Sequence, residues 1–105
     1  MEYIINIKKV CGKNIVTRDD GKKVRDLIEL QWTLIDKIKI DFGNVLVASV
    51  SFFDEIFGRL ALKYSRSELT EKIIMENIQE YDRALLNDIL RSRFRQQELK
   101  FQRQN

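Results

Sequence analysis

The sequence predicts an α/β fold in which a small mixed β-sheet, built from an N-terminal hairpin and parallel strands, packs against about three helices. Short segments rich in β-branched residues occur at 3–10, 37–42 and 71–76, and segments with apolar residues at helical spacing follow each of them. Strands joined through helices form right-handed crossovers and therefore lie parallel. The length of 105 residues predicts one domain over 1–105, with 95–105 as a polar, basic tail.

The first predicted element is a hairpin. Residues 3–10 are rich in β-forming side chains and partly alternate between apolar and polar. Residues 11–14 contain Gly12, which can supply the positive φ that tight hairpin turns need. Residues 15–17 are then predicted to form the returning strand.

A helix is predicted over residues 18–34. Thr17 is its expected N-cap, and Asp20, three residues later, completes a short version of the capping box. The apolar side chains that recur at helical spacing are Val24, Leu27, Ile28, Leu34 and Ile35. The alternating segment 37–42 then predicts a strand.

The clearest helical pattern begins near residue 51. Its apolar stripe consists of Phe53, Ile56, Phe57, Leu60, Ala61 and Tyr64. Ser51 is the predicted N-cap, with Asp54 at the position of the capping-box acid. Residues 64–67 break the pattern, residues 71–76 predict a strand, and a third helix is predicted from residue 78 to at least residue 94.

The composition argues against an enzyme. The chain has no His and one Cys, so it lacks the base of serine–histidine and cysteine–histidine catalysis and the usual ligands of structural zinc. Asp41 and Asp54 could be paired as acid and base, but no nucleophile accompanies them, and Asp41 at a strand end is expected to accept backbone N–H bonds. We expect no catalytic residue, no cofactor and no metal.

The expected compartment is the cytoplasm. The apolar stretch at the N-terminus is too short and too polar for a signal peptide. No window approaches the roughly 18–20 apolar residues that span a bilayer, so no membrane association is expected. Cys11 has no second cysteine to pair with, which is typical of a reducing compartment.

The positive charge is concentrated at the C-terminal end. Residues 91–105 carry five basic residues and one acidic residue, whereas residues 1–90 carry 14 basic and 15 acidic residues. The tail could contact phosphates, with Phe94 and Phe101 stacking on bases, so a nucleic-acid-associated module is an alternative. Alternating charge on a terminal helix more often forms a solvated surface. A structural homodimer, with Leu99 and Phe101 docking on a second copy, is a third reading.

Two segments carry a family resemblance. Residues 38–45 read Ile-Lys-Ile-Asp-Phe-Gly-Asn-Val, and residues 48–58 read Ala-Ser-Val-Ser-Phe-Phe-Asp-Glu-Ile-Phe-Gly. Together with Gly12, the pair Thr17-Arg18 and Asn77, they resemble a small bacterial family of STAS-like domains of unknown function. The resemblance covers nearly the whole chain and implies a relation to bacterial anti-sigma-factor antagonists.

The resemblance implies a regulatory protein that acts through protein–protein binding and partner switching. Such antagonists bind a kinase-like ATPase that is both anti-sigma factor and serine kinase, and phosphorylation of a serine at the start of the second helix breaks the complex. Val50 occupies the phosphoacceptor position here, with Ser49 before it and Phe52 in the place of the usual glycine. Two alternatives follow: the protein-binding surface works without a phosphorylation switch, or Ser49 or Ser51 takes the phosphate.

These inferences give a set of candidate residues for partner binding or regulation. The set comprises Thr17, Arg18, Ser49, Ser51, Asp54 and Arg59. Arg59, with Lys63, could steer an acidic partner toward the second helix. Ser51 has a competing structural role as a helix N-cap, which the sequence favours over phosphorylation.

Overall fold

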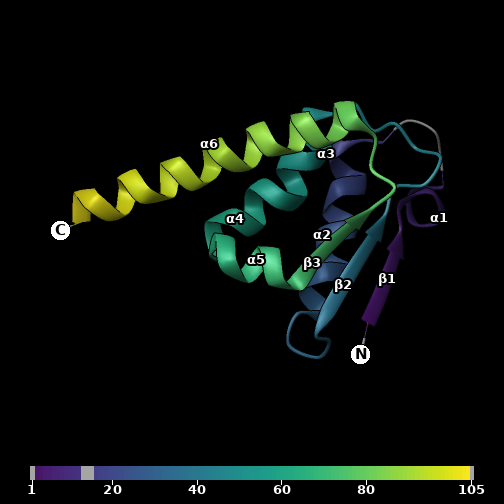
Figure 1. Ribbon diagram of the computed structural model, residues 1–105, viewed down its shortest axis with the longest axis horizontal. Coiled ribbons are helices and arrows are strands. Elements are labelled where there is room, and N and C mark those ends of the chain that lie inside the picture. The colour runs from purple at the N-terminus through teal and green to yellow at the C-terminus, as the bar shows by residue number, and fades with distance from the viewer. Residues whose placement is uncertain (1, 13–15, 105) are drawn as a thin grey trace.

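Three parallel strands form an open sheet in the order β1-β2-β3 (Figure 1). The structure is a computed structural model that describes residues 2–12 and 16–104, with the backbone alone for residues 100–104. The elements in chain order are β1 (Glu2–Asn6), α1 (Ile7–Cys11), α2 (Arg18–Gln31), β2 (Lys37–Asp41), α3 (Val50–Phe53), the π-helical turn η1 (Asp54–Gly58), α4 (Arg59–Lys63), α5 (Arg66–Lys72), β3 (Ile73–Glu76) and α6 (Glu80–Gln104). In register, Ile5 lies beside Ile40, and Ile40 lies beside Met75. The predicted α/β class is confirmed.

The predicted N-terminal hairpin is wrong. Residues 7–11 form α1, because the Asn6 side chain caps this helix by accepting a hydrogen bond from the Lys9 N–H at 3.0 Å. Gly12 does have a positive φ, of 67°, but it ends α1 instead of turning a hairpin. Of the expected returning strand, residue 15 lies outside the described residues, and residues 16 and 17 belong to no strand. The sheet is therefore parallel throughout instead of mixed.

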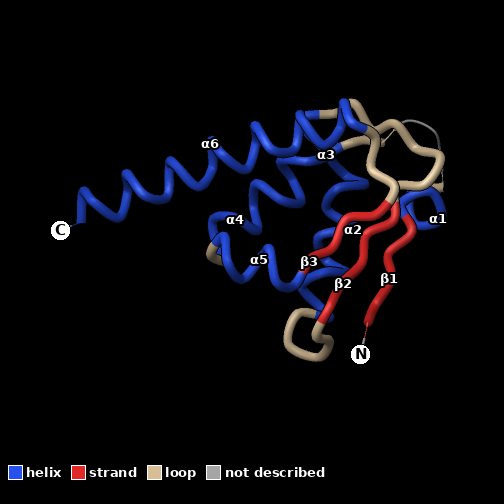
Figure 2. Tube along the Cα trace, in the orientation of Figure 1, coloured by secondary structure: helices blue, strands red, loops and turns tan. Residues whose placement is uncertain are grey.

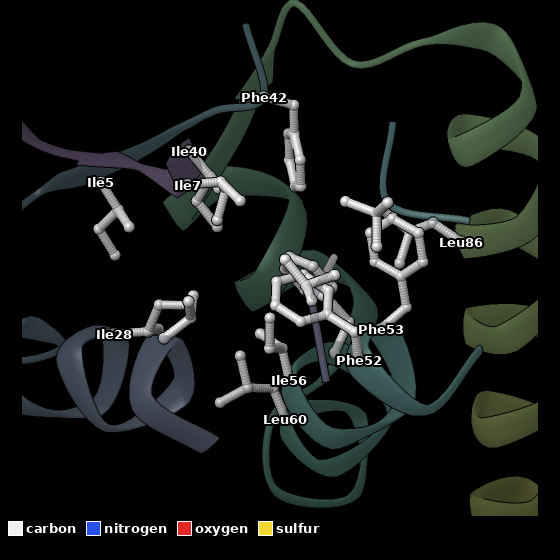
Figure 3. Close-up of a cluster of buried hydrophobic side chains, with 14 of the residues drawn as sticks. Ile5, Ile7, Ile28, Ile40, Phe42, Phe52, Phe53, Ile56, Leu60 and Leu86 are labelled. Atoms are coloured by element: carbon white, nitrogen blue, oxygen red, sulfur yellow. The ribbon is translucent and has the colours of Figure 1, made fainter. Parts of the chain in front are cut away.

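The apolar core lies between one face of the sheet and the helices. Ile5, Ile38 and Ile40 from the sheet are buried, as are Val24 and Ile28 from α2. These side chains pack in one cluster with apolar side chains of α3, η1 and α4 (Figure 3). On the opposite face of the sheet, Lys39 of β2 forms ion pairs with both outer strands, at 3.2 Å to Glu2 and 3.4 Å to Glu76. Ile4 and Ile74 lie beside Lys39 on this face, and Ile4 is exposed.

Helix two is the continuous segment 50–63, which comprises α3, η1 and α4. Its predicted apolar stripe is confirmed, since Phe53, Ile56, Phe57, Leu60 and Ala61 are all buried. Its predicted N-cap is wrong. The side chain of Ser49, not Ser51, accepts the hydrogen bond from the Phe52 N–H, at 3.2 Å.

Helix α2 begins as predicted and ends three residues early. Thr17 and Asp20 form the full capping box, each side chain accepting from the other residue's backbone N–H. Gly21 lies where α2 crosses helix two. A Cβ atom at Gly21 would stand 2.9 Å from the Phe52 carbonyl oxygen and 3.1 Å from the Cβ of Glu55. Gly21 therefore sets the close approach of the two helices rather than merely weakening the first turn.

Two elements differ from the prediction on the C-terminal side. Residues 66–72 form a helix, α5, capped by Ser65 and Glu68, where the sequence predicts a break and the start of a strand. Asn77 adopts a left-handed conformation with a φ of 58°, and α6 begins only at Glu80. Helix α6 then runs past the rest of the chain into the predicted basic tail (Figure 2).

Candidate functional site

A buried carboxylate, that of Glu55, holds three arginines at the crossing of α2 and helix two. The Glu55 side chain is only 8% exposed. Its oxygens lie 3.1 Å from Arg18 Nη1, 3.0 Å from Arg25 Nη1 and 3.6 Å from Arg59 Nε. Arg25 also donates to the Glu55 backbone carbonyl at 3.0 Å, which ties the two helices together.

The local sequence explains how these side chains meet. The capping box at Thr17 starts α2 so that Arg18 is its first residue, and Arg25 follows two turns later on the same side. Gly21 lies between them and lets Glu55 approach the helix closely. Arg59 follows Glu55 by one turn of helix two.

The cluster has a surplus of positive charge, since three guanidinium groups face one carboxylate. Burial alone would raise the pKa of Glu55, but the charges of Arg59 and Arg25 and the hydrogen bonds from Arg18 and Arg25 outweigh it and lower that pKa. Arg25 is largely buried, at 16% exposed, whereas the side chains of Arg18 and Arg59 are 57% and 60% exposed. Two guanidinium groups are thus held in place and open to solvent.

The structure brings together some of the predicted site residues. Arg18 and Arg59 share Glu55, and Thr17 directly precedes Arg18. Ser49 and Ser51 flank Val50, which is 57% exposed, at the start of helix two. Because this first turn packs on Gly21 through Phe52, it belongs to the same side of the domain as the arginine cluster.

Asp54 does not join this group. Its carboxylate forms a two-pronged ion pair with Arg93 of α6, at 2.8 Å to Nε and 2.6 Å to Nη2. Gly58 leaves room for this pair, because a Cβ there would lie 2.1 Å from Asp54 Oδ1. Asp54 thus ties α6 to helix two.

Asp41 has a structural role as well. It accepts hydrogen bonds from the Gly43 N–H at 2.8 Å and from the Asn77 side chain at 2.9 Å. The Asn77 hydrogen bond and then the Gly43 N–H lower the pKa of Asp41. The expectation that Asp41 accepts backbone N–H bonds is confirmed, and both carboxylates considered for acid–base work are engaged by partners of their own.

Sequence reasoning missed Asp82, on the first turn of α6. Its side chain is completely buried and accepts hydrogen bonds from the backbone N–H groups of Val47 at 2.6 Å and Ala48 at 2.8 Å. These residues lie in the loop just before Ser49, at the end of the domain where the loops after β2 and β3 gather (Figure 2). Asp82 therefore fixes the start of helix two.

Phe94, which the nucleic-acid alternative would use for stacking on bases, is buried, and Arg66 lies over its ring, 4.9 Å from the centroid. Phe101 lies outside the described side chains, and Leu99 is exposed. In the part of the chain that the structure describes, His, Cys, Asp and Glu side chains do not gather in threes in a way that could hold a metal ion. Among the described helices, none combines the length and apolar character that a membrane crossing requires.

Comparison with known families places the fold. A family model described as a STAS-like domain of unknown function matches residues 20–83, which run from the third residue of α2 to the first turn of α6 and include Glu55 and Asp82. Searches of curated proteins and of solved structures gave no match. The match covers more than half of the chain, and the sheet with its helices agrees with it; the chain belongs to the family of STAS-like domains of unknown function.

Proposed function

We propose that this domain is a non-enzymatic regulatory domain of the bacterial cytoplasm that acts by binding another protein. The observation that carries the proposal is the pair of exposed arginines held on buried Glu55 where helix two crosses α2. We call this surface the arginine face and define it by Thr17, Arg18, Val50, Ser51 and Arg59. The partner contributes an acidic surface that meets it.

The arginine face has the physical properties of a docking surface. Arg18 and Arg59 are already oriented by Glu55, so binding costs less side-chain entropy than it would for free arginines. Their charges exceed what one carboxylate neutralises, which favours fast association with an acidic partner. Val50, exposed in the first turn of the same helix as Arg59, offers an apolar contact.

The partner is a kinase-like ATPase or an anti-sigma factor. This part of the proposal rests on the relation of STAS-like domains to anti-sigma-factor antagonists, and the arginine face supports it by lying at the corresponding start of helix two. The domain would work as a switch that is free in one state of the partner and bound in the other.

The switch can be controlled at Ser51. The Ser49 hydroxyl is already used as the helix cap, whereas Ser51 lies half-buried in the first turn, one turn before Glu55. A phosphate on Ser51 would add nearly two negative charges next to the surplus positive charge of the cluster. It would attract Arg18 and Arg59 and thereby remove the charge that the partner meets.

Removing the two exposed arginines tests the docking face. The variant R18Q/R59Q leaves the Arg25–Glu55 pair in place, so the buried carboxylate stays neutralised. We expect its affinity for a kinase-like ATPase from the same genome to fall by at least about tenfold, measured by biolayer interferometry with each purified ATPase. The variant K8Q/K9Q removes the same charge from α1 and should bind as the wild type does. Equal binding by R18Q/R59Q, or no ATPase that binds the wild type, would contradict the proposal.

Phosphorylation is tested with the ATPase that binds. Incubation with ATP should add one phosphate, located on Ser51 by mass spectrometry, and the modified domain should bind at least about tenfold more weakly. The S51A variant should stay unmodified, whereas S49A should still be modified. A phosphate found on Ser49, or unchanged affinity after full modification of Ser51, would overturn the switch but leave the docking face standing.

A further inference from the structure

Residues of α5, β3 and α6 line a groove of about 440 Å³. Figure 1 shows where these three elements lie in the fold. Apart from Phe57 of η1, the groove's lining residues lie on elements other than those that carry the arginine face. Half-buried apolar side chains of Ile73, Met75 and Leu90 line it, above the buried rings of Phe57 and Phe94. Its volume falls within the range of about 300–1,000 Å³ that is typical of binding sites.

Both walls of the groove are helix faces. On α6 the lining side chains recur at helical spacing, in the order Arg83, Leu86, Asn87, Leu90, Arg91 and Phe94. At 1.5 Å per residue this face is about 16 Å long, or three turns of helix. The other wall is the face of α5 formed by Arg66, Leu69 and Thr70. The α5 wall, from residue 66 to residue 70, is only about 6 Å long, so an occupant of about 16 Å would follow the α6 wall and contact α5 over part of its length.

The charge of the groove has a single sign. Arg66, Arg83 and Arg91 line it, and none of its lining residues is acidic. Arg91 has only a loose ion pair with Asp88, at 3.5 Å between two side chains that are mostly exposed. Arg83 forms no ion pair within the described residues. The groove thus combines an apolar floor with a basic rim.

We propose that this groove binds an amphipathic, acidic helix of about three turns from a partner protein. Apolar side chains of that helix would lie on Ile73, Met75 and Leu90, and its acidic side chains would meet the three arginines. The tail of a second copy of this chain fits poorly, because residues 91–105 carry five basic residues and one acidic residue. The inference goes beyond the proposed function, since neither Arg18 nor Arg59 lines the groove.

The test uses a synthetic peptide of about 15 residues with Leu at i, i+4, i+7 and i+11 and Glu at the flanking positions. Titrated into the isotope-labelled full chain, it should shift backbone NMR signals of α5, β3 and residues 83–94 of α6, and less so at higher salt. The variant R83Q/R91Q should bind at least about fivefold more weakly. The variant R95Q removes an exposed α6 charge outside the groove and should bind as the wild type does.

Several results would overturn the inference. One is the absence of NMR shifts at about 1 mM peptide, because any dissociation constant would then lie above about 1 mM, too weak for a specific interaction. Others are equal binding of the same peptide with Lys in place of Glu, or shifts located at the arginine face. A separate titration uses dodecyl phosphate. If dodecyl phosphate binds in the groove and the peptide does not, the groove is a site for small amphipathic anions and the proposed helix is not its ligand. R18Q/R59Q should bind the peptide normally, so this test and that of the docking face can fail independently.

Discussion

Replacing Glu55 with alanine should lower the free energy of unfolding by about 3–5 kcal/mol, the usual cost of breaking a buried ion pair. Within the described residues, the change removes the one carboxylate that Arg18, Arg25 and Arg59 share. Most of this destabilisation comes from Arg25, because its largely buried guanidinium would be left without its carboxylate at the helix crossing. Urea unfolding followed by circular dichroism would measure the difference.

A matched control is available on the surface. Glu29 on α2 pairs with Lys63 of α4 at 3.5 Å, with both side chains substantially exposed. E29A should therefore cost less than about 1 kcal/mol. If E55A costs no more than E29A, the Glu55 cluster does not hold α2 to helix two. E55Q, which keeps the shape of the side chain, extends the comparison should E55A not fold.

The lowered pKa of Glu55 predicts that its contribution to the free energy of unfolding depends on pH. Because the arginines lower the pKa of Glu55 in the folded state, its contribution is complete above the ordinary carboxyl pKa of about 4.3 and is lost as the pH falls through the lower, folded value. The stability difference between wild type and E55Q should therefore be largest near neutral pH and shrink below about pH 4. Using this difference cancels the acid response of Asp41, whose pKa is also lowered. A constant difference from neutral pH to acid would contradict the assigned charge interactions.

Regular patterns in the sequence predict much of the fold. The apolar stripe of helix two, the capping box of Thr17 and Asp20, and the alternating strand β2 each depend on nearby residues, and each is confirmed. The N-terminal hairpin fails for a local reason, since Asn6 caps a helix that the β-branched residues around it conceal. Helix α5 is missed because it is short and buries only one side chain, Leu69, although its capping box was visible in the sequence.

The candidate site depends on contacts between distant residues, which local patterns do not reveal. Asp54 and Glu55 look alike in sequence, as two acids near the start of a helix. In the fold Asp54 meets Arg93, thirty-nine positions away, whereas Glu55 turns toward α2 at Gly21. The sequence therefore indicates the right region through Arg18 and Arg59 but not the carboxylate that organises it.

Local patterns also fail to predict where helix two begins. Ser51 with Asp54 matches a capping box better than Ser49 does, yet Ser49 is the cap. The reason lies just before it, where Ala48 adopts a left-handed conformation with a φ of 47° and Asp82 binds its N–H. A side chain of α6 thus helps to decide where helix two begins.

Replacing Asp82 with alanine should consequently lower the free energy of unfolding by about 2–6 kcal/mol, because two backbone N–H groups that it binds would each lose a partner at about 1–3 kcal/mol. D82N keeps one acceptor oxygen and should recover about half of the loss. D88A, which breaks only the exposed contact with Arg91, should cost less than about 1 kcal/mol.

Hydrogen exchange would separate a local effect of Asp82 from a global one. If Asp82 fixes the start of helix two, D82A should exchange the Phe52 N–H, which Ser49 caps, much faster than amides in the middle of α2. Equal acceleration at both places would mean that Asp82 stabilises the domain as a whole without defining this helix start. That outcome would also weaken the docking face, because Val50 and Ser51 are presented to a partner only if the first turn of helix two stays fixed.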